Sequence, residues 1–126
     1  MGSREKGKSK YPLVKSFSFA CQGILEAVRT ERNIQIHFVA MLVVVFFGWY
    51  FSLNGMEWLF ILAAIAGTIA LELVNSAIER VVDLVTDQIH PLAKQAKDIA
   101  AGAVFIYAIF SIIVGLIIFL PKLGMM

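Results

Sequence analysis

The stretch LELVNSAIERVVDLVTD, residues 71–87, decides how this chain folds, because it begins inside an uncharged apolar run and ends as a charged segment. At 100° per residue its polar side chains fall within an arc of roughly 100°, and most of its Leu, Val and Ile residues lie outside that arc. We call this polar face the acidic stripe, and it consists of Glu72, Asn75, Ser76, Glu79, Asp83 and Thr86.

The first carboxylate of the stripe is expected at membrane depth. The uncharged run 58–71 leads into Glu72 without a proline or a turn signal. A hydrocarbon layer of about 30 Å takes about twenty helical residues, which places Glu72 inside it and Glu79 at the far interface. Ionisable groups at this depth usually face a bundle interior or a water-filled cavity. Asn75 and Ser76 alone would fit a structural contact between helices, but carboxylates on one face repel each other, which favours a functional site.

Composition predicts an all-α integral membrane protein. The chain has 126 residues, of which 60% are hydrophobic and only 16% charged, and its mean hydropathy is +0.82. Residues 1–12 read as a mobile basic tail, and 13–126 as a single domain. That domain is predicted to contain an amphipathic surface helix at 13–30 and spans at about 34–53, 57–86 and 98–120.

Two features of this layout indicate an oligomer in the membrane. Three spans enclose a polar stripe poorly, so we expect neighbouring subunits to supply the missing walls. Phe19 lies on the polar side of helix 13–30. There it is expected to cover a ligand or to touch a neighbouring subunit.

Lysine and arginine set the expected orientation. Seven precede the first span: Arg4, Lys6, Lys8, Lys10, Lys15, Arg29 and Arg32. The connection at Asn54 has none, and Arg80, Lys94 and Lys97 flank the second connection. The positive-inside rule then places the N-terminus and residues 80–98 in the cytoplasm and the C-terminus outside. The net charge of +2 does not indicate nucleic acid, and the basic N-terminus suits anionic lipid headgroups.

The stripe suits phosphoryl transfer. Oxygen ligands favour Mg²⁺, which commonly binds through one or two carboxylates and substrate phosphates, and Lys97 is placed to hold phosphate charge. No glycine-rich phosphate loop is present. A proton or cation pathway stays open as the alternative, although outward of Glu72 only Thr68 offers an ion ligand. His37, one turn inside the first span, is expected to be a hydrogen-bonded interfacial residue.

The motif also carries a family resemblance. ELVNSAIERVVDLVTD (72–87), followed by HPLAKQAKDIAAGAV (90–104), closely resembles the prokaryotic diacylglycerol kinase family of small trimeric membrane kinases. RTERNIQIH (29–37) and GLIIFLPKL (115–123) resemble its Gram-positive branch, whose members are undecaprenol kinases. The resemblance covers residues 15–123.

The resemblance implies an ATP- and Mg²⁺-dependent kinase of the bacterial cytoplasmic membrane that phosphorylates undecaprenol, with diacylglycerol as the alternative acceptor. It implies a homotrimer whose sites are shared between protomers. By motif position, Glu72 is the general base, Glu31 and Glu79 hold the metal, and Phe19, Glu31 and Glu72 contact the lipid. The ATP-binding positions are Glu31, Asn75, Glu79, Asp83, Gln88, His90, Lys97 and Asp98.

Overall fold

The computed structural model describes residues 4–5, 8–9 and 12–124. Most of the predicted mobile tail, namely residues 1–3, 6–7 and 10–11, lies outside the described residues. Within the tail, β1 (Arg4–Glu5) and β2 (Lys8–Ser9) form a short antiparallel pair, and the other described elements are all helices, as predicted.

Four helices make up the rest of the described chain: α1 (Leu13–Thr30), α2 (Arg32–Tyr50), α3 (Gly55–Val85) and α4 (Pro91–Gly124). α1 occupies the range predicted for the surface helix, and its place on a membrane surface stays a prediction. α2, α3 and α4 are long and apolar enough to cross a membrane. The third span belongs to a helix that begins at Pro91, well before residue 98. Proline is well suited to a first helical position because its φ angle is already helical and its missing N–H is not needed there.

Local signals in the sequence set the helix boundaries. Asn54 caps α3: its side chain accepts a hydrogen bond from the Glu57 N–H, and the Glu57 side chain accepts one from the Asn54 N–H. At the start of α4, His90 Nδ1 accepts a hydrogen bond from the Leu92 N–H at 3.1 Å. Glu31, in extended conformation, is the single residue between α1 and α2.

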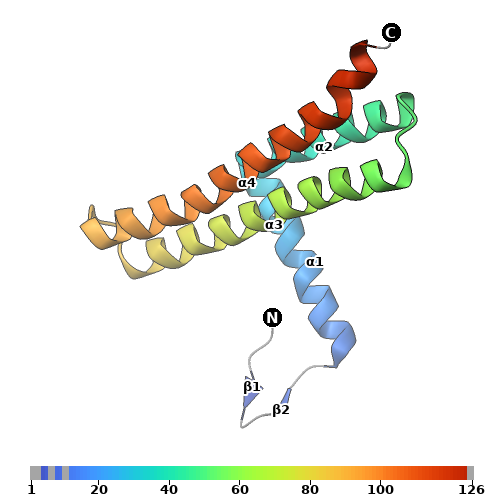
Figure 1. Ribbon diagram of the computed structural model, residues 1–126. Helices are drawn as coiled ribbons and strands as arrows, with labels where there is room; N and C mark the ends of the chain where they lie inside the picture. Colours follow the sequence, from blue (N-terminus) through green and yellow to red (C-terminus); the bar gives the residue numbers. More distant parts are fainter. Residues whose placement is uncertain (1–3, 6–7, 10–11, 125–126) are drawn as a thin grey trace.

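The helices form a bundle of three with one arm (Figure 1). α3 and α4 run antiparallel along each other, and α2 lies beside their far ends, where the C-terminus also lies. α1 leaves the bundle at the α1–α2 junction and points away from it. The small core consists of Leu53, Ile61, Val114 and Ile118. Most other large apolar side chains on α2 and α4 are exposed, as expected of surfaces that face lipid or other subunits.

The α3–α4 contact is tight where small residues face polar ones. The Tyr107 hydroxyl donates a hydrogen bond to the Ala63 carbonyl at 2.7 Å, and the Thr68 and Ser111 hydroxyl oxygens lie 3.0 Å apart. A Cβ atom on Gly67 would lie 2.1 Å from Tyr107. The glycine is therefore required for this helix pair to approach so closely.

Replacing Gly67 by Ala is expected to destabilise the protein by about 1–3 kcal/mol, because the Tyr107 ring and α3 must move apart. Thermal unfolding in detergent micelles measures the loss. Gly23→Ala in α1 is the control, since a Cβ there meets nothing within 4 Å. An equal melting temperature for Gly67→Ala and the wild type would contradict the packing described above.

Candidate active site

Helix α3 carries three different environments in succession, beginning with an apolar groove. This groove has a volume of about 410 Å³ and lies between α2, α3 and α4. Its walls include His37, Met41, Ile61, Thr68, Ser111 and Phe119. Apart from His37, Thr68 and Ser111, the lining is apolar or glycine. The groove is therefore suited to a hydrocarbon chain.

Buried polar groups follow on α3. The exposed fractions of Glu72, Asn75 and Ser76 are 6%, 9% and 5%, which confirms that this part of the stripe faces the bundle interior. His37 Nε2 on α2 lies 3.4 Å from Glu72 Oε1. Asn75 Oδ1 is buried and has no hydrogen-bond partner among the described residues. A buried acceptor of this kind is unusual, and a ligand, a water molecule or a neighbouring subunit can supply the donor.

A polar cleft of about 370 Å³ completes the series, between the end of α3 and the start of α4. Five of the predicted ATP-binding residues line it together: Asp83, Gln88, His90, Lys97 and Asp98. Lys97 Nζ lies 2.7 Å from Asp83 Oδ1, and Lys94 Nζ lies 2.6 Å from Asp98 Oδ2. The chain reversal after Val85 brings these groups together, because it folds the start of α4 back onto the end of α3.

Lys94 and Lys97, the two lysines of the cleft, precede the uncharged span 99–120. The pKa of each is raised, which favours the charged form. The hydrogen bond to the Asp83 carboxylate raises the pKa of Lys97; desolvation opposes this, and the charges of Asp83 and Glu79 support it. The hydrogen bond and charge of Asp98 likewise raise the pKa of Lys94, against a smaller opposing effect of desolvation. The cleft thus contains two ammonium groups able to contact phosphate, and each of them is paired with a carboxylate in this structure.

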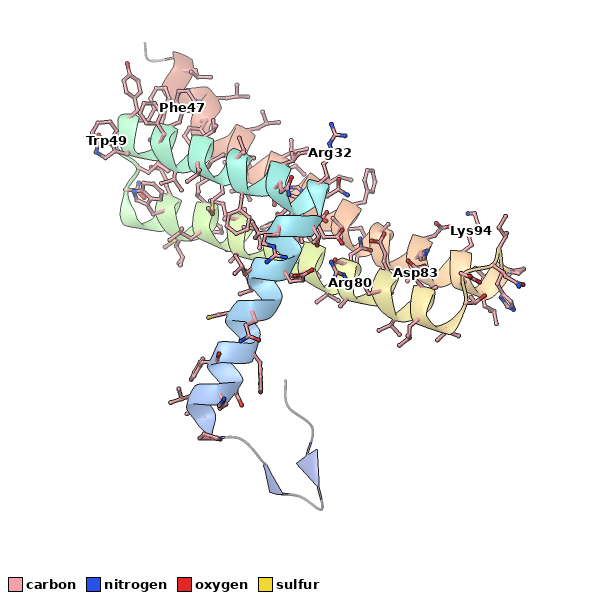
Figure 2. All side chains as sticks on the ribbon, turned by 180° about the vertical axis from the view of Figure 1, so that it is seen from behind. Arg32, Phe47, Trp49, Arg80, Asp83 and Lys94 are labelled. Carbon is pink, nitrogen blue, oxygen red and sulfur yellow. The ribbon has the colours of Figure 1, made fainter. Side chains whose placement is uncertain are left out.

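Glu31 forms an ion pair that the sequence does not predict. Arg80 Nη2 lies 3.1 Å from Glu31 Oε2 and donates a hydrogen bond to the Thr30 hydroxyl at 2.7 Å. The pair ties the α1–α2 junction to α3 (Figure 2). The resemblance implies that Glu31 and Glu79 hold one metal ion, and the structure pairs Glu31 with Arg80, the residue that follows Glu79.

The metal site expected at Glu31 and Glu79 stays a prediction. Among the described residues, no three or more His, Cys, Asp or Glu side chains form a group able to hold a metal ion. Two carboxylates are nonetheless a sufficient protein contribution for Mg²⁺ when substrate phosphates supply other ligands. The carboxylate chemistry of Glu31 and Glu79 suits that ion, and one oxygen of Glu31 is paired with Arg80 in this structure. Phe19 is half-buried on α1, and its contact with the lipid also stays a prediction.

The predicted residues do not converge on one point within the chain. Glu72 and Asp83 are eleven residues apart on α3, which is roughly 16 Å at 1.5 Å per residue. Glu72 lies near the groove, and Lys97 lies in the cleft. Within a single chain, Glu72 and the cleft residues are therefore too far apart to form the one site that the sequence predicts.

The sequence predicts His37 as an interfacial residue, whereas the structure places it beside Glu72. A count along the chain would have found it, since His37 lies 17 residues before Asn54 and Glu72 lies 18 residues after it. Antiparallel helices joined by a short turn bring residues equally distant from the turn to the same depth.

The chain is similar to known proteins over most of its length. The sequence profile of the family described as prokaryotic diacylglycerol kinase matches residues 18–119. The undecaprenol kinase of Bacillus subtilis is 50% identical over 123 residues, which cover 98% of this chain and 100% of that protein. A diacylglycerol kinase of Synechocystis is 39% identical over 88% of this chain and 64% of its own length. The diacylglycerol kinase of Escherichia coli is 26% identical over 89% of this chain and 92% of its own length.

The Lys97–Asp83 contact predicts a specific change in lysine reactivity. Asp83→Asn removes the carboxylate that holds the Lys97 proton, so Lys97 should be acetylated faster at about pH 9, where only the deprotonated amine reacts. Mass spectrometry after brief labelling measures the rate. Lys94, which is paired with Asp98, serves as the internal control and should not change. Equal Lys97 rates in the variant and the wild type would show that the contact does not form in solution.

Proposed function

This chain belongs to the prokaryotic diacylglycerol kinase family, a family of lipid kinases, and we propose that it transfers the γ-phosphoryl group of ATP to the hydroxyl of undecaprenol at the cytoplasmic membrane interface. The observation that carries the proposal is the order of environments along α3. A buried carboxylate, Glu72, lies between an apolar groove and a polar cleft. This order suits an acceptor with a hydrocarbon tail and a donor with a charged tail.

The acceptor side is the groove. A lipid alcohol whose chain lies between α2, α3 and α4 would present its hydroxyl near His37, and hence near Glu72. Undecaprenol is the preferred acceptor because the Bacillus relative of that name matches this chain over its full length at 50% identity. Diacylglycerol is the alternative, since the more distant relatives carry that name.

The donor side is the cleft. Lys97 supplies a cation for the phosphates, and Gln88, His90 and Asp98 supply polar contacts around it. Asp83 lines the cleft, and Asn75 lies on α3 between Asp83 and Glu72. Glu31 and Glu79 would hold Mg²⁺, whose contribution when bound is to neutralise phosphate charge.

Glu72 acts as the general base in this proposal. As the hydroxyl oxygen of the lipid forms its bond to the γ-phosphorus, its proton passes to a carboxylate oxygen of Glu72. The bond between the γ-phosphorus and the bridging oxygen breaks, and ADP leaves with that electron pair. Positioning of the reactants and electrostatic stabilisation supply the remainder of the rate enhancement.

The separation of groove and cleft supports a shared site. Because roughly 16 Å of helix lies between Glu72 and Asp83, a neighbouring protomer is needed to bring a nucleotide cleft to each base. A homotrimer with sites between its subunits meets this need. The exposed apolar side chains of α2 and α4, among them Leu42 and Ile106, provide surface for such contacts.

The orientation follows from the two ends of the bundle. Phe47 and Trp49 lie at one end, while Asp83 and Lys94 lie at the other (Figure 2). Aromatic belts mark a membrane interface, and cationic loops remain in the cytoplasm. We therefore place the α3–α4 connection and α1 in the cytoplasm and the C-terminus outside.

Transfer of labelled phosphate from Mg-ATP in mixed micelles tests the activity, with undecaprenol and diacylglycerol as parallel acceptors. Undecaprenol should be labelled faster, and Glu72→Gln should lower the rate by at least about 100-fold, because an amide accepts no proton. Glu57→Gln is the matched control on α3, since Gln also serves in a capping box and Glu57 lies at the opposite end of the helix. Faster labelling of diacylglycerol would change the acceptor, and near-normal turnover by Glu72→Gln would remove the base.

The lone cysteine tests the orientation. Cys21 is exposed on α1, so a membrane-impermeant maleimide should label it only after cells are permeabilised. A cysteine placed at Leu123 in a Cys21→Ser background should be labelled in intact cells. Labelling of Cys21 in intact cells would reverse the proposed topology.

A further inference from the structure

We propose that His37 is the positioning residue of this kinase, holding one oxygen of Glu72 so that the carboxylate meets the lipid hydroxyl in a fixed orientation. The inference rests on the proposed function, because it assigns a role within the same reaction. His37 touches neither phosphate nor metal in this account, and it acts through Glu72.

The contact itself is the first observation. His37 Nε2 lies 3.4 Å from Glu72 Oε1, and the two residues come from adjacent helices, α2 and α3. This is slightly longer than the usual hydrogen-bond range of about 2.7–3.2 Å, as catalytic contacts often are before the substrate binds. The contact involves Oε1 alone of the two carboxylate oxygens.

Burial makes the contact significant. The Glu72 side chain is only 8% exposed, whereas that of His37 is 29% exposed. A carboxylate with so little access to water must obtain its hydrogen bonds from protein or substrate. Among the ion-pair contacts of residues 12–124, only that of His37 involves Glu72.

The location of His37 separates a functional role from a purely structural one. The same side chain forms part of the wall of the apolar groove, together with Met41 and Thr68. A pair that only joined α2 to α3 would not need to face a cavity. Because His37 faces both the groove and the base, an alcohol that enters along the groove reaches the carboxylate beside the imidazole.

The proposed role requires that His37 Nε2 carries a proton and donates a hydrogen bond. An imidazole with its proton on Nε2 donates to Oε1 and leaves the second carboxylate oxygen to accept the hydroxyl proton during transfer. Glutamine places its amide N–H about where Nε2 lies and replaces the donor. Asparagine is too short to reach, and leucine offers no donor.

The test uses phosphate transfer to undecaprenol by the full-length protein. His37→Leu and His37→Asn should lower kcat by about 100-fold with little change in the KM for ATP, because misplacement of a catalytic group slows chemistry without affecting a remote nucleotide cleft. His37→Gln should restore most of the activity. Ile36→Val, at an exposed position on the same helix, is the control and should not change kcat.

A double variant provides the sharper criterion. If His37 acts through Glu72, adding His37→Leu to Glu72→Gln should cause no further loss, since residues that act as a unit are not additive. Nearly normal kcat in His37→Leu, an equal loss in His37→Gln and His37→Leu, or additive losses in the double variant would each overturn the inference.

Failure of the proposed function has a different signature. If the wild-type protein labels neither lipid, the function is wrong and the role of His37 in it falls as well. If the wild type labels undecaprenol and His37→Leu labels it equally fast, only the positioning role is wrong. Should His37→Leu fail to fold, the polar variants His37→Asn and His37→Gln still decide between the outcomes.

Discussion

The burial of one carboxylate inside a thin apolar bundle constrains the rest of this structure. Glu72 has almost no contact with solvent, and a buried carboxylate needs hydrogen-bond partners from the protein or from a ligand. His37 Nε2 lies 3.4 Å from Glu72 Oε1, and this contact requires α2 and α3 to be antiparallel neighbours with a short turn between them. The capped turn at Asn54 therefore helps to set the geometry of the site, although it lies at the opposite end of the bundle.

The sequence predicted most of the fold because the relevant signals are local. Uncharged length identifies the three spans, Pro91 marks the start of α4, and the 3.6-residue period identifies the acidic stripe. The observed helix boundaries differ from the predicted ones by a few residues. The largest difference is at the start of α4, where charged residues before the span are also helical. Hydropathy reports the part of a helix that suits hydrocarbon, whereas hydrogen bonding determines the full length of the helix.

The sequence predicts which residues line the cleft, but it does not predict which distant residues contact each other. Asp83, Gln88, His90, Lys97 and Asp98 line one cleft, as the motif implied, because a chain reversal brings neighbouring segments together. The pairs His37–Glu72 and Arg80–Glu31 join residues 35 and 49 positions apart, and no local period reveals such pairs. They depend on how far each helix extends from its turn and how it is rotated about its axis.

The lengths of α3 and α4 also bear on the membrane that surrounds them. Glu72 lies 18 residues after Asn54, or roughly 27 Å along α3, which is close to the hydrocarbon thickness of about 30 Å. In the proposed membrane placement, a hydrocarbon layer that begins at the Asn54 turn would therefore end close to the level of Glu72. Asp83 lies eleven residues, or roughly 16 Å, farther along α3, so the cleft would lie beyond the hydrocarbon. The length of α3 would thus place the proposed base at the lipid boundary and the polar cleft on the aqueous side of it.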